Sequence, residues 1–153
     1  MSTKKIVIVA ILVVAAGAAI YGWSEFNRKN EDLSGVKAAY TVEAMQLINE
    51  FNQNDSAANA RYLGRVVAVS GLVKQVEKDE EGKYTVVLGD TADMSSVRCA
   101  LDSTHAADAT GLHRGESIQV KGSFTGFKKD DTGLLGSDVE LNRGVIIKNK
   151  SGQ

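Results

Sequence analysis

The chain of 153 residues lacks proline, has a single cysteine and carries no excess of positive charge. Because Cys99 is alone, no disulfide can form within the chain. Of the 18 basic side chains, Lys4 and Lys5 precede a long apolar run, which leaves 16 against 19 acidic residues. A nucleic-acid-binding domain normally concentrates positive potential on one face, so this balance argues against that class. The length and a hydrophobic content of 43% suit one domain with an appendage.

The sequence also lacks the patterns of common catalytic centres. No Ser/His/Asp spacing, nucleophile elbow or phosphate-binding loop is present, so nothing supports hydrolysis or phosphoryl transfer. His105 and His113, with Asp108 and Cys99, form too loose a set for a metal site. Cys99 alternates with apolar residues and is predicted to be a buried core residue, as free cysteines usually are. We therefore expect no enzyme, cofactor or metal centre.

An uncharged run of 18 residues, Ile6 to Trp23, follows Lys4 and Lys5. As a helix it would measure about 27 Å, close to the roughly 30 Å core of a bilayer. The basic residues favour a cytoplasmic start, and Tyr21 and Trp23 suit the opposite interface. We expect residues 1–24 to be a single-pass anchor in the cytoplasmic membrane, with the rest of the chain in the periplasm.

A cleavable signal peptide is the alternative for the same segment. The small residues from Ala15 to Ala19 contain spacings that a signal peptidase accepts. Either process exports the remainder of the chain. The polar residues 25–39 that follow, with charges of both signs, are predicted to be a tether.

An amphipathic helix is predicted after the tether. Thr41 is a candidate N-cap, and the next apolar residues follow at helical spacing, at positions 44, 47, 48 and 51. Such a short helix is not stable alone, so its apolar face must pack on a neighbouring element. A second helical turn, beginning at Asn54 or Asp55, leads to Tyr62.

Five strands are predicted beyond this point, at 62–73, 84–88, 96–101, 117–124 and 139–147. The first is rich in valine and contains Gly71, at which a strand can bulge or bend around a barrel corner. A brief helix is predicted at 103–111, between the third and fourth strands. This order is that of the mainly β OB-fold, a five-stranded Greek-key barrel. We assign the barrel domain to residues 40–148 and a tail to 149–153.

The same residues carry a family resemblance, on the following positions: Ala44, Leu47, Phe51, Asn54, Ala58, Tyr62, Gly64, Val66, Val69, Gly71, Val73, Val97, Cys99, Gly115, Val120, Gly122, Gly126, Phe127, Leu141, Val145 and Ile146. With them the chain resembles the bacterial lipoprotein OB-fold domains named for their likeness to the tRNA anticodon-binding OB domain. The resemblance implies an exported, membrane-attached domain whose ligand is unassigned. Many similar domains have a lipidated cysteine, and cysteines near the positions of Phe124 and Gly144. This chain has neither, which puts a lipid anchor and a barrel-closing disulfide in doubt.

OB-folds bind through a barrel face and its loops, here 74–83 and 124–137. The stretch Gly122 to Phe127 is expected at the loop between the fourth and fifth strands. The candidate ligand-binding residues are Lys74, Lys83, Tyr84, Phe124, Phe127, Lys128 and Lys129. We expect a non-catalytic binding module whose partner is another envelope protein or a glycan. The alternative is binding of single-stranded nucleic acid or an oligosaccharide through the barrel face.

Overall fold

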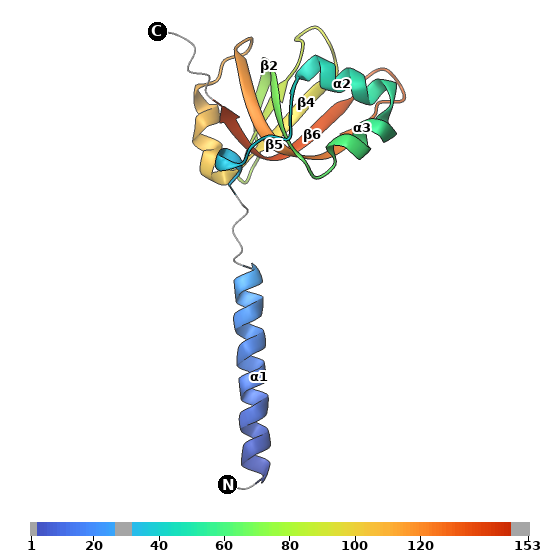
Figure 1. Cartoon of the computed structure of the whole chain (residues 1–153). Coiled ribbons are helices and arrows are strands. Elements are labelled where there is room, and N and C mark those ends of the chain that lie inside the picture. The colour runs from blue at the N-terminus through green and yellow to red at the C-terminus, as the bar shows by residue number, and fades with distance from the viewer. Residues whose placement is uncertain (1–2, 27–31, 148–153) are drawn as a thin grey trace. The chain divides into compact units, whose positions relative to one another are not determined.

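The computed structural model describes residues 3–26 and 32–147, and the chain divides into two units, residues 1–31 and 32–153. The first unit is the helix α1, Thr3–Phe26 (Figure 1). The second contains the predicted barrel. The expected tail at 149–153, and residues 27–31 of the expected tether, lie outside the described residues.

Helix α1 covers the whole uncharged run, so the prediction of a helix there is confirmed. Its described apolar side chains, such as Leu12, Val14 and Ile20, are exposed. Within residues 3–26 and 32–147, no helix combines the length and the apolar character needed to cross a membrane. The structure thus shows the helix that was predicted over 6–23 but shows no transmembrane anchor.

The second unit is a closed barrel of five strands, as predicted, but the first strand runs over 66–78 and not over 62–73, because Tyr62 ends a helix. The five strands are β2 (Val66–Lys78), β3 (Tyr84–Leu88), β4 (Ser96–Leu101), β5 (Ser117–Lys128) and β6 (Asp138–Ile147). The order around the barrel is β2-β3-β4-β6-β5, and pairing of β2 with β5 closes it. The β4–β6 pair is parallel and the other barrel pairs are antiparallel.

Strand β2 makes closure possible because its two halves pair with different partners. Residues 66–72 pair with β5, and residues 73–78 pair with β3. The change of partner follows Gly71, next to a register shift between Val73 and Gln75. A Cβ at Gly71 would lie 3.0 Å from the Cβ of Ala44, so the glycine also allows Ala44 to lie close to the strand.

Two helices precede β2, namely α2 (Ala44–Gln53) and α3 (Asp55–Tyr62), and they lie next to each other against the barrel (Figure 1). The predicted apolar face of α2 is confirmed, because all four of its members are buried. Phe51 of this face stacks on Phe124 and Phe127, with ring centroids 5.0 and 4.8 Å apart. Asn54 caps α3 by accepting a hydrogen bond from the Ala57 amide at 3.0 Å.

A short strand that the sequence analysis missed, β1 (Tyr40–Glu43), pairs in parallel with β2 from Val67 to Ser70. Thr41 therefore lies in a strand, and its prediction as N-cap is wrong. Glu43 occupies the N-cap of α2 without a side-chain capping bond. Pairing with β2 supplies the backbone hydrogen bonds of this segment. Residues 40–43 are therefore extended, although Thr41 has the side chain of a helix N-cap.

Residues 32–39, part of the expected tether, pack on the barrel. The 3₁₀ turn η1 (Leu33–Gly35) buries Leu33, which is 2% exposed. The buried Lys121 of β5 donates from Nζ to the carbonyl oxygens of Ser34 and Val36, at 2.9 and 2.7 Å. These contacts fix the entry of the chain to the barrel.

The helix between the third and fourth barrel strands is confirmed as the 3₁₀ helix η2 (Ser103–Gly111), which buries Ala109. The expected loop at Gly122 to Phe127 is wrong, because β5 continues to Lys128. Its extension pairs with β6 from Phe124 opposite Leu141 to Lys128 opposite Asp138. The connection between these strands is residues 129–137.

Substitution of Gly144 tests the packing inside the barrel. A Cβ there would overlap the Sγ of the buried Cys99 and lie 3.0 Å from the carbonyl oxygen of Ala100. We expect Gly144→Ala to lower the free energy of unfolding by about 1–3 kcal/mol, the usual cost of overpacking. Gly126→Ala is the matched control, because its nearest atom would be a Glu140 carboxylate oxygen at 3.8 Å. Urea unfolding measures both, and equal stabilities of the two variants would contradict this account.

Candidate binding surface

Lys74, the first predicted ligand-binding residue, is engaged within the protein. From β2, its Nζ donates to the carbonyl oxygens of Asp93 and Ser95, at 2.5 and 3.0 Å, and to the Ser96 hydroxyl at 3.0 Å. An ammonium group has three donors, so these three acceptors use them all. Lys74 therefore holds the loop 89–95 against the barrel.

The other three predicted lysines form exposed ion pairs. Lys83 pairs with Glu81, Lys128 with Glu140 at 2.5 Å, and Lys129 with Asp131 at 3.8 Å. Exposed pairs contribute only about 0–1 kcal/mol, so a ligand can separate them. They nevertheless cancel the local positive potential that would attract an anionic polymer.

The predicted aromatic residues do not form an exposed stacking surface. Phe124 is 1% exposed, and Phe127 packs partly buried against the same Phe51 ring. Tyr84 is partly exposed, and the Nζ of Lys78 lies 5.4 Å from its ring centroid. The structure thus buries Phe124 in the core and packs one side of the partly exposed Phe127 on Phe51, so the two rings do not form an open stacking surface.

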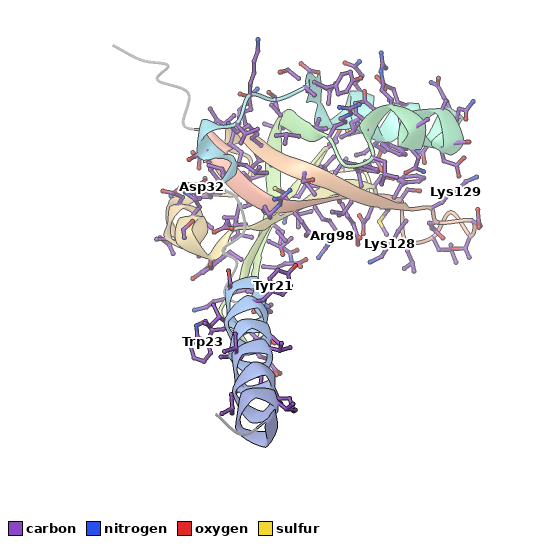
Figure 2. The ribbon with its side chains drawn as sticks, turned by 60° about the horizontal axis from the view of Figure 1, so that its bottom comes forward. Tyr21, Trp23, Asp32, Arg98, Lys128 and Lys129 are labelled. Carbon is purple, nitrogen blue, oxygen red and sulfur yellow. The ribbon has the colours of Figure 1, made fainter. Side chains whose placement is uncertain are left out.

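The outer face of the barrel carries a row of alternating charge that the sequence analysis did not identify. Arg98 of β4 pairs with Glu77 of β2 and lies opposite Glu140 of β6 in the strand register. Glu140 in turn pairs with Lys128 of β5. Figure 2 labels Arg98 and Lys128 among the side chains of this part of the barrel. The row contains two acidic and two basic residues, which balance in charge. Asp138, opposite Lys128 in the strand register, adds a further carboxylate beside them, so this part of the face has no excess of positive charge. Strand register creates the row, and register is not visible in the sequence.

The two histidines do not come together. The Nε2 of His105 lies 3.0 Å from an Asp32 carboxylate oxygen, and its Nδ1 lies 3.6 Å from Asp108. His105 thereby joins η2 to the segment that enters the barrel. His113 instead donates its amide to the Glu116 carboxylate at 3.0 Å. In the described part of the chain, no three His, Cys, Asp or Glu side chains are grouped to hold a metal ion.

Cys99 is fully buried, which confirms the prediction of a core residue. Burial raises the pKa of its thiol to about 12. The thiol is therefore protonated at neutral pH, whereas a nucleophilic cysteine requires the thiolate.

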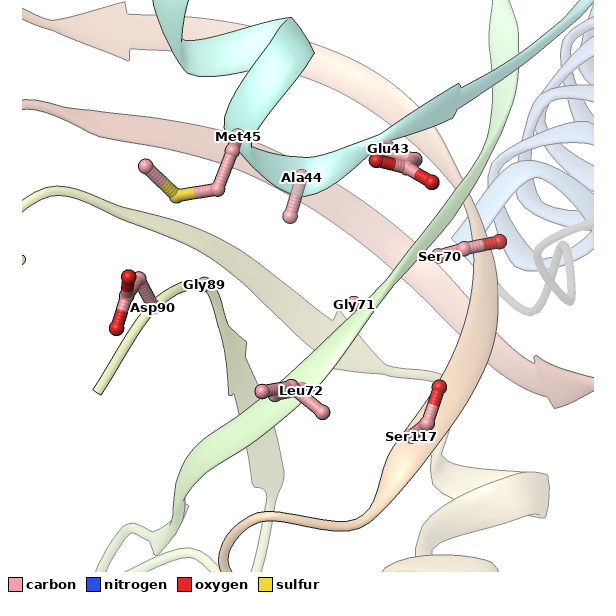
Figure 3. A pocket seen from close by; sticks show the side chains of 9 residues that line it. All are labelled: Glu43, Ala44, Met45, Ser70, Gly71, Leu72, Gly89, Asp90 and Ser117. Atoms are coloured by element: carbon pink, nitrogen blue, oxygen red, sulfur yellow. The ribbon is translucent and has the colours of Figure 1, made fainter.

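An open cavity of about 350 Å³ lies where the start of α2 approaches β2 at Gly71 (Figure 3). Ala44, Gly71 and Gly89 supply walls with little side chain, and the carboxylates of Glu43 and Asp90 also line it. None of the predicted lysines lines it, although the side chain of Lys74 lies next to Gly89 in its wall. The close approach of Gly71 to Ala44 shapes this cavity. No sequence pattern predicts that contact.

Comparisons with known proteins agree with the barrel. The tRNA_anti-like family model matches residues 1–138. A structure from Klebsiella pneumoniae, described as a putative nucleic acid-binding lipoprotein, is 20% identical, with a TM-score of 0.55. The match covers 79% of this chain and 100% of that one. Asparaginyl-tRNA synthetase from Pyrococcus horikoshii is 19% identical with a TM-score of 0.37, over 57% of this chain and 20% of that one. A comparison with curated proteins finds no match.

Replacement of Lys74 tests whether it has a structural role. Lys74→Met removes the donor to two carbonyl oxygens and the Ser96 hydroxyl, so we expect a loss of about 1–3 kcal/mol in the free energy of unfolding. Amide exchange in residues 89–95 should become faster. Lys83→Met, which removes only an exposed pair with Glu81, should change stability by less than about 0.5 kcal/mol. Unchanged exchange in Lys74→Met would show that the loop does not depend on this side chain.

Proposed function

The chain belongs to the tRNA_anti-like family of OB-fold domains, and from this premise we propose that it is a non-catalytic module that binds another protein. The observation that carries this proposal is the lack of excess positive charge in the row on the outer face of the barrel. Arg98 and Lys128, which could attract phosphates, alternate with Glu77 and Glu140 in one row. Polar surfaces with charges of both signs occur at the rims of protein interfaces, whereas phosphate binding requires an excess of lysine and arginine.

The placement of the aromatic residues supports a protein partner over a single strand or a glycan. Base stacking contributes about 1–3 kcal/mol per base in single-strand binding and requires accessible rings. Phe124 and Phe127 pack instead against Phe51 of α2. Nucleic acid remains the second candidate, because the relative from Klebsiella pneumoniae is described as binding it.

We also propose that the N-terminal segment attaches the module to the cytoplasmic membrane and that the barrel works on the periplasmic side. Support comes from the sequence, in which Lys4 and Lys5 precede the uncharged run from Ile6 to Trp23. The partner would then be another protein of the cell envelope.

Single-strand binding tests the proposal directly. With the full-length chain and fluorescein-labelled oligo(dT) or oligo(U), we expect no saturable rise in anisotropy at protein concentrations up to about 100 µM near physiological salt. Tight binding that weakens steeply between about 50 and 200 mM salt would replace the protein-binding proposal with nucleic-acid binding.

A pair of variants makes the same assay sharper. Glu77→Gln with Glu140→Gln frees Arg98 and Lys128, and should create weak, salt-dependent binding. Asp55→Asn with Glu80→Gln changes net charge equally at exposed sites outside the row and should not. A similar gain in both variants would show that net charge, and not the row, governs binding.

The proposed location is tested by a fusion after Gln153. An alkaline phosphatase fusion should be active and should sediment with membranes, whereas deletion of residues 2–24 should leave it inactive in the cytosol. If the N-terminal segment is cleaved instead, the active fusion will be shorter and will stay in the soluble fraction, which would identify a signal peptide. An inactive full-length phosphatase fusion would overturn the periplasmic location.

A further inference from the structure

Three large apolar side chains project from two loops at neighbouring positions of the barrel. Leu134 and Leu135, in the β5–β6 connection 129–137, are 73% and 77% exposed, and Met94, in the β3–β4 connection, is 60% exposed. The backbones of the two loops touch. Gly136 packs against the main chain of Met94 and Ser95 so closely that any Cβ would overlap it.

The loop that carries the leucines is held in one conformation by Asp130. Its carboxylate accepts hydrogen bonds from the amides of Thr132, Leu135 and Gly136, at 2.9, 2.6 and 3.1 Å, and from the Thr132 hydroxyl at 2.5 Å. These bonds, first that from the Thr132 hydroxyl, lower the pKa of Asp130, so the carboxylate stays ionised at neutral pH. Gly133 and Gly136 supply the positive φ values that the turn requires.

The neighbouring loop is fixed as well. Lys74 binds the carbonyl oxygens of Asp93 and Ser95, and the Ser95 hydroxyl accepts the Ser137 amide at 3.1 Å. The Ser137 carbonyl accepts the Ser96 amide at 3.0 Å. The exposed apolar side chains therefore stand on a rigid support. A preorganised apolar group loses little conformational entropy on binding, which is typical of interface anchors.

The charge around these side chains selects the kind of partner. The loops 89–95 and 129–137 contain four aspartates, at positions 90, 93, 130 and 131, and one lysine, Lys129. The ammonium group of Lys74 also lies at the first loop, so four negative charges face two positive ones. An anionic bilayer would be repelled by this rim, and so would the same acidic loops of a second copy. A protein groove with an apolar floor and basic edges complements both features.

We propose that Met94, Leu134 and Leu135 form a docking surface for an apolar groove of a partner protein that is bordered by lysine or arginine side chains. This inference rests on the proposed protein-binding function and names its surface and partner chemistry. The leucines enter the groove, and the aspartates of the two loops pair with its basic rim.

Selection of random peptides displayed on phage against the full-length chain tests this surface. Enriched peptides should combine large apolar with basic residues. Leu134→Ser with Leu135→Ser should weaken their binding at least about tenfold. Leu63→Ser, at a leucine that is 62% exposed at the end of α3, is the matched control and should leave affinity unchanged. Asp130→Ala keeps both leucines but removes the bonds that hold the loop, and should also weaken binding.

Several results would overturn the inference. They are failure to enrich peptides, enrichment of acidic ones, or binding that the double serine variant leaves intact. In the last case the peptides bind elsewhere and the protein-binding function stands. Leucine-dependent sedimentation with phosphatidylglycerol vesicles would identify a membrane contact instead, and leucine-dependent dimerisation would identify a second copy. Salt-sensitive binding of oligo(U) would contradict the proposed function itself.

Discussion

Closure of the barrel depends on one strand that serves two partners. Strand β2 pairs with β5 along 66–72 and with β3 along 73–78, and the change of partner lies between Gly71 and the register shift at Val73 to Gln75. Without this change of partner β5 could not pair with β2, and the sheet would stay open. Gly71 also allows Ala44 of α2 to lie close to the strand. The core and the cavity at the start of α2 therefore both follow from one local geometry.

Closure also determines the chemistry of the outer surface. The parallel register of β4 and β6 places Arg98 opposite Glu140, and the antiparallel register of β5 and β6 brings Lys128 within reach of the same carboxylate. A shift of one residue would turn these side chains to the other face. The charge balance of this row is thus a product of strand pairing. It contrasts with the basic groove in which other OB-folds hold single strands.

The barrel was largely predictable from the sequence because its signals are local. Strands β3 and β4 begin and end at the predicted residues, and the spacing of Leu47, Ile48 and Phe51 defines the buried face of α2. Strand β1 was missed because a parallel contact with β2, distant in sequence, decides its conformation. The site residues were harder still. Lys74 and Phe124 are of residue types that often bind ligands. In the structure Lys74 binds the carbonyl oxygens of Asp93 and Ser95, and Phe124 is buried in the core.

The attachment of residues 32–39 has a mechanical consequence. Tension that enters the barrel at Asp32 meets the buried Leu33 and the two carbonyl bonds of Lys121 before it reaches β1. Beyond them, the parallel pairing of β1 with β2 spreads the load over several hydrogen bonds at once. Force applied at Asp32 must therefore break the contacts of Leu33 and Lys121 before it acts on β1 and the start of α2.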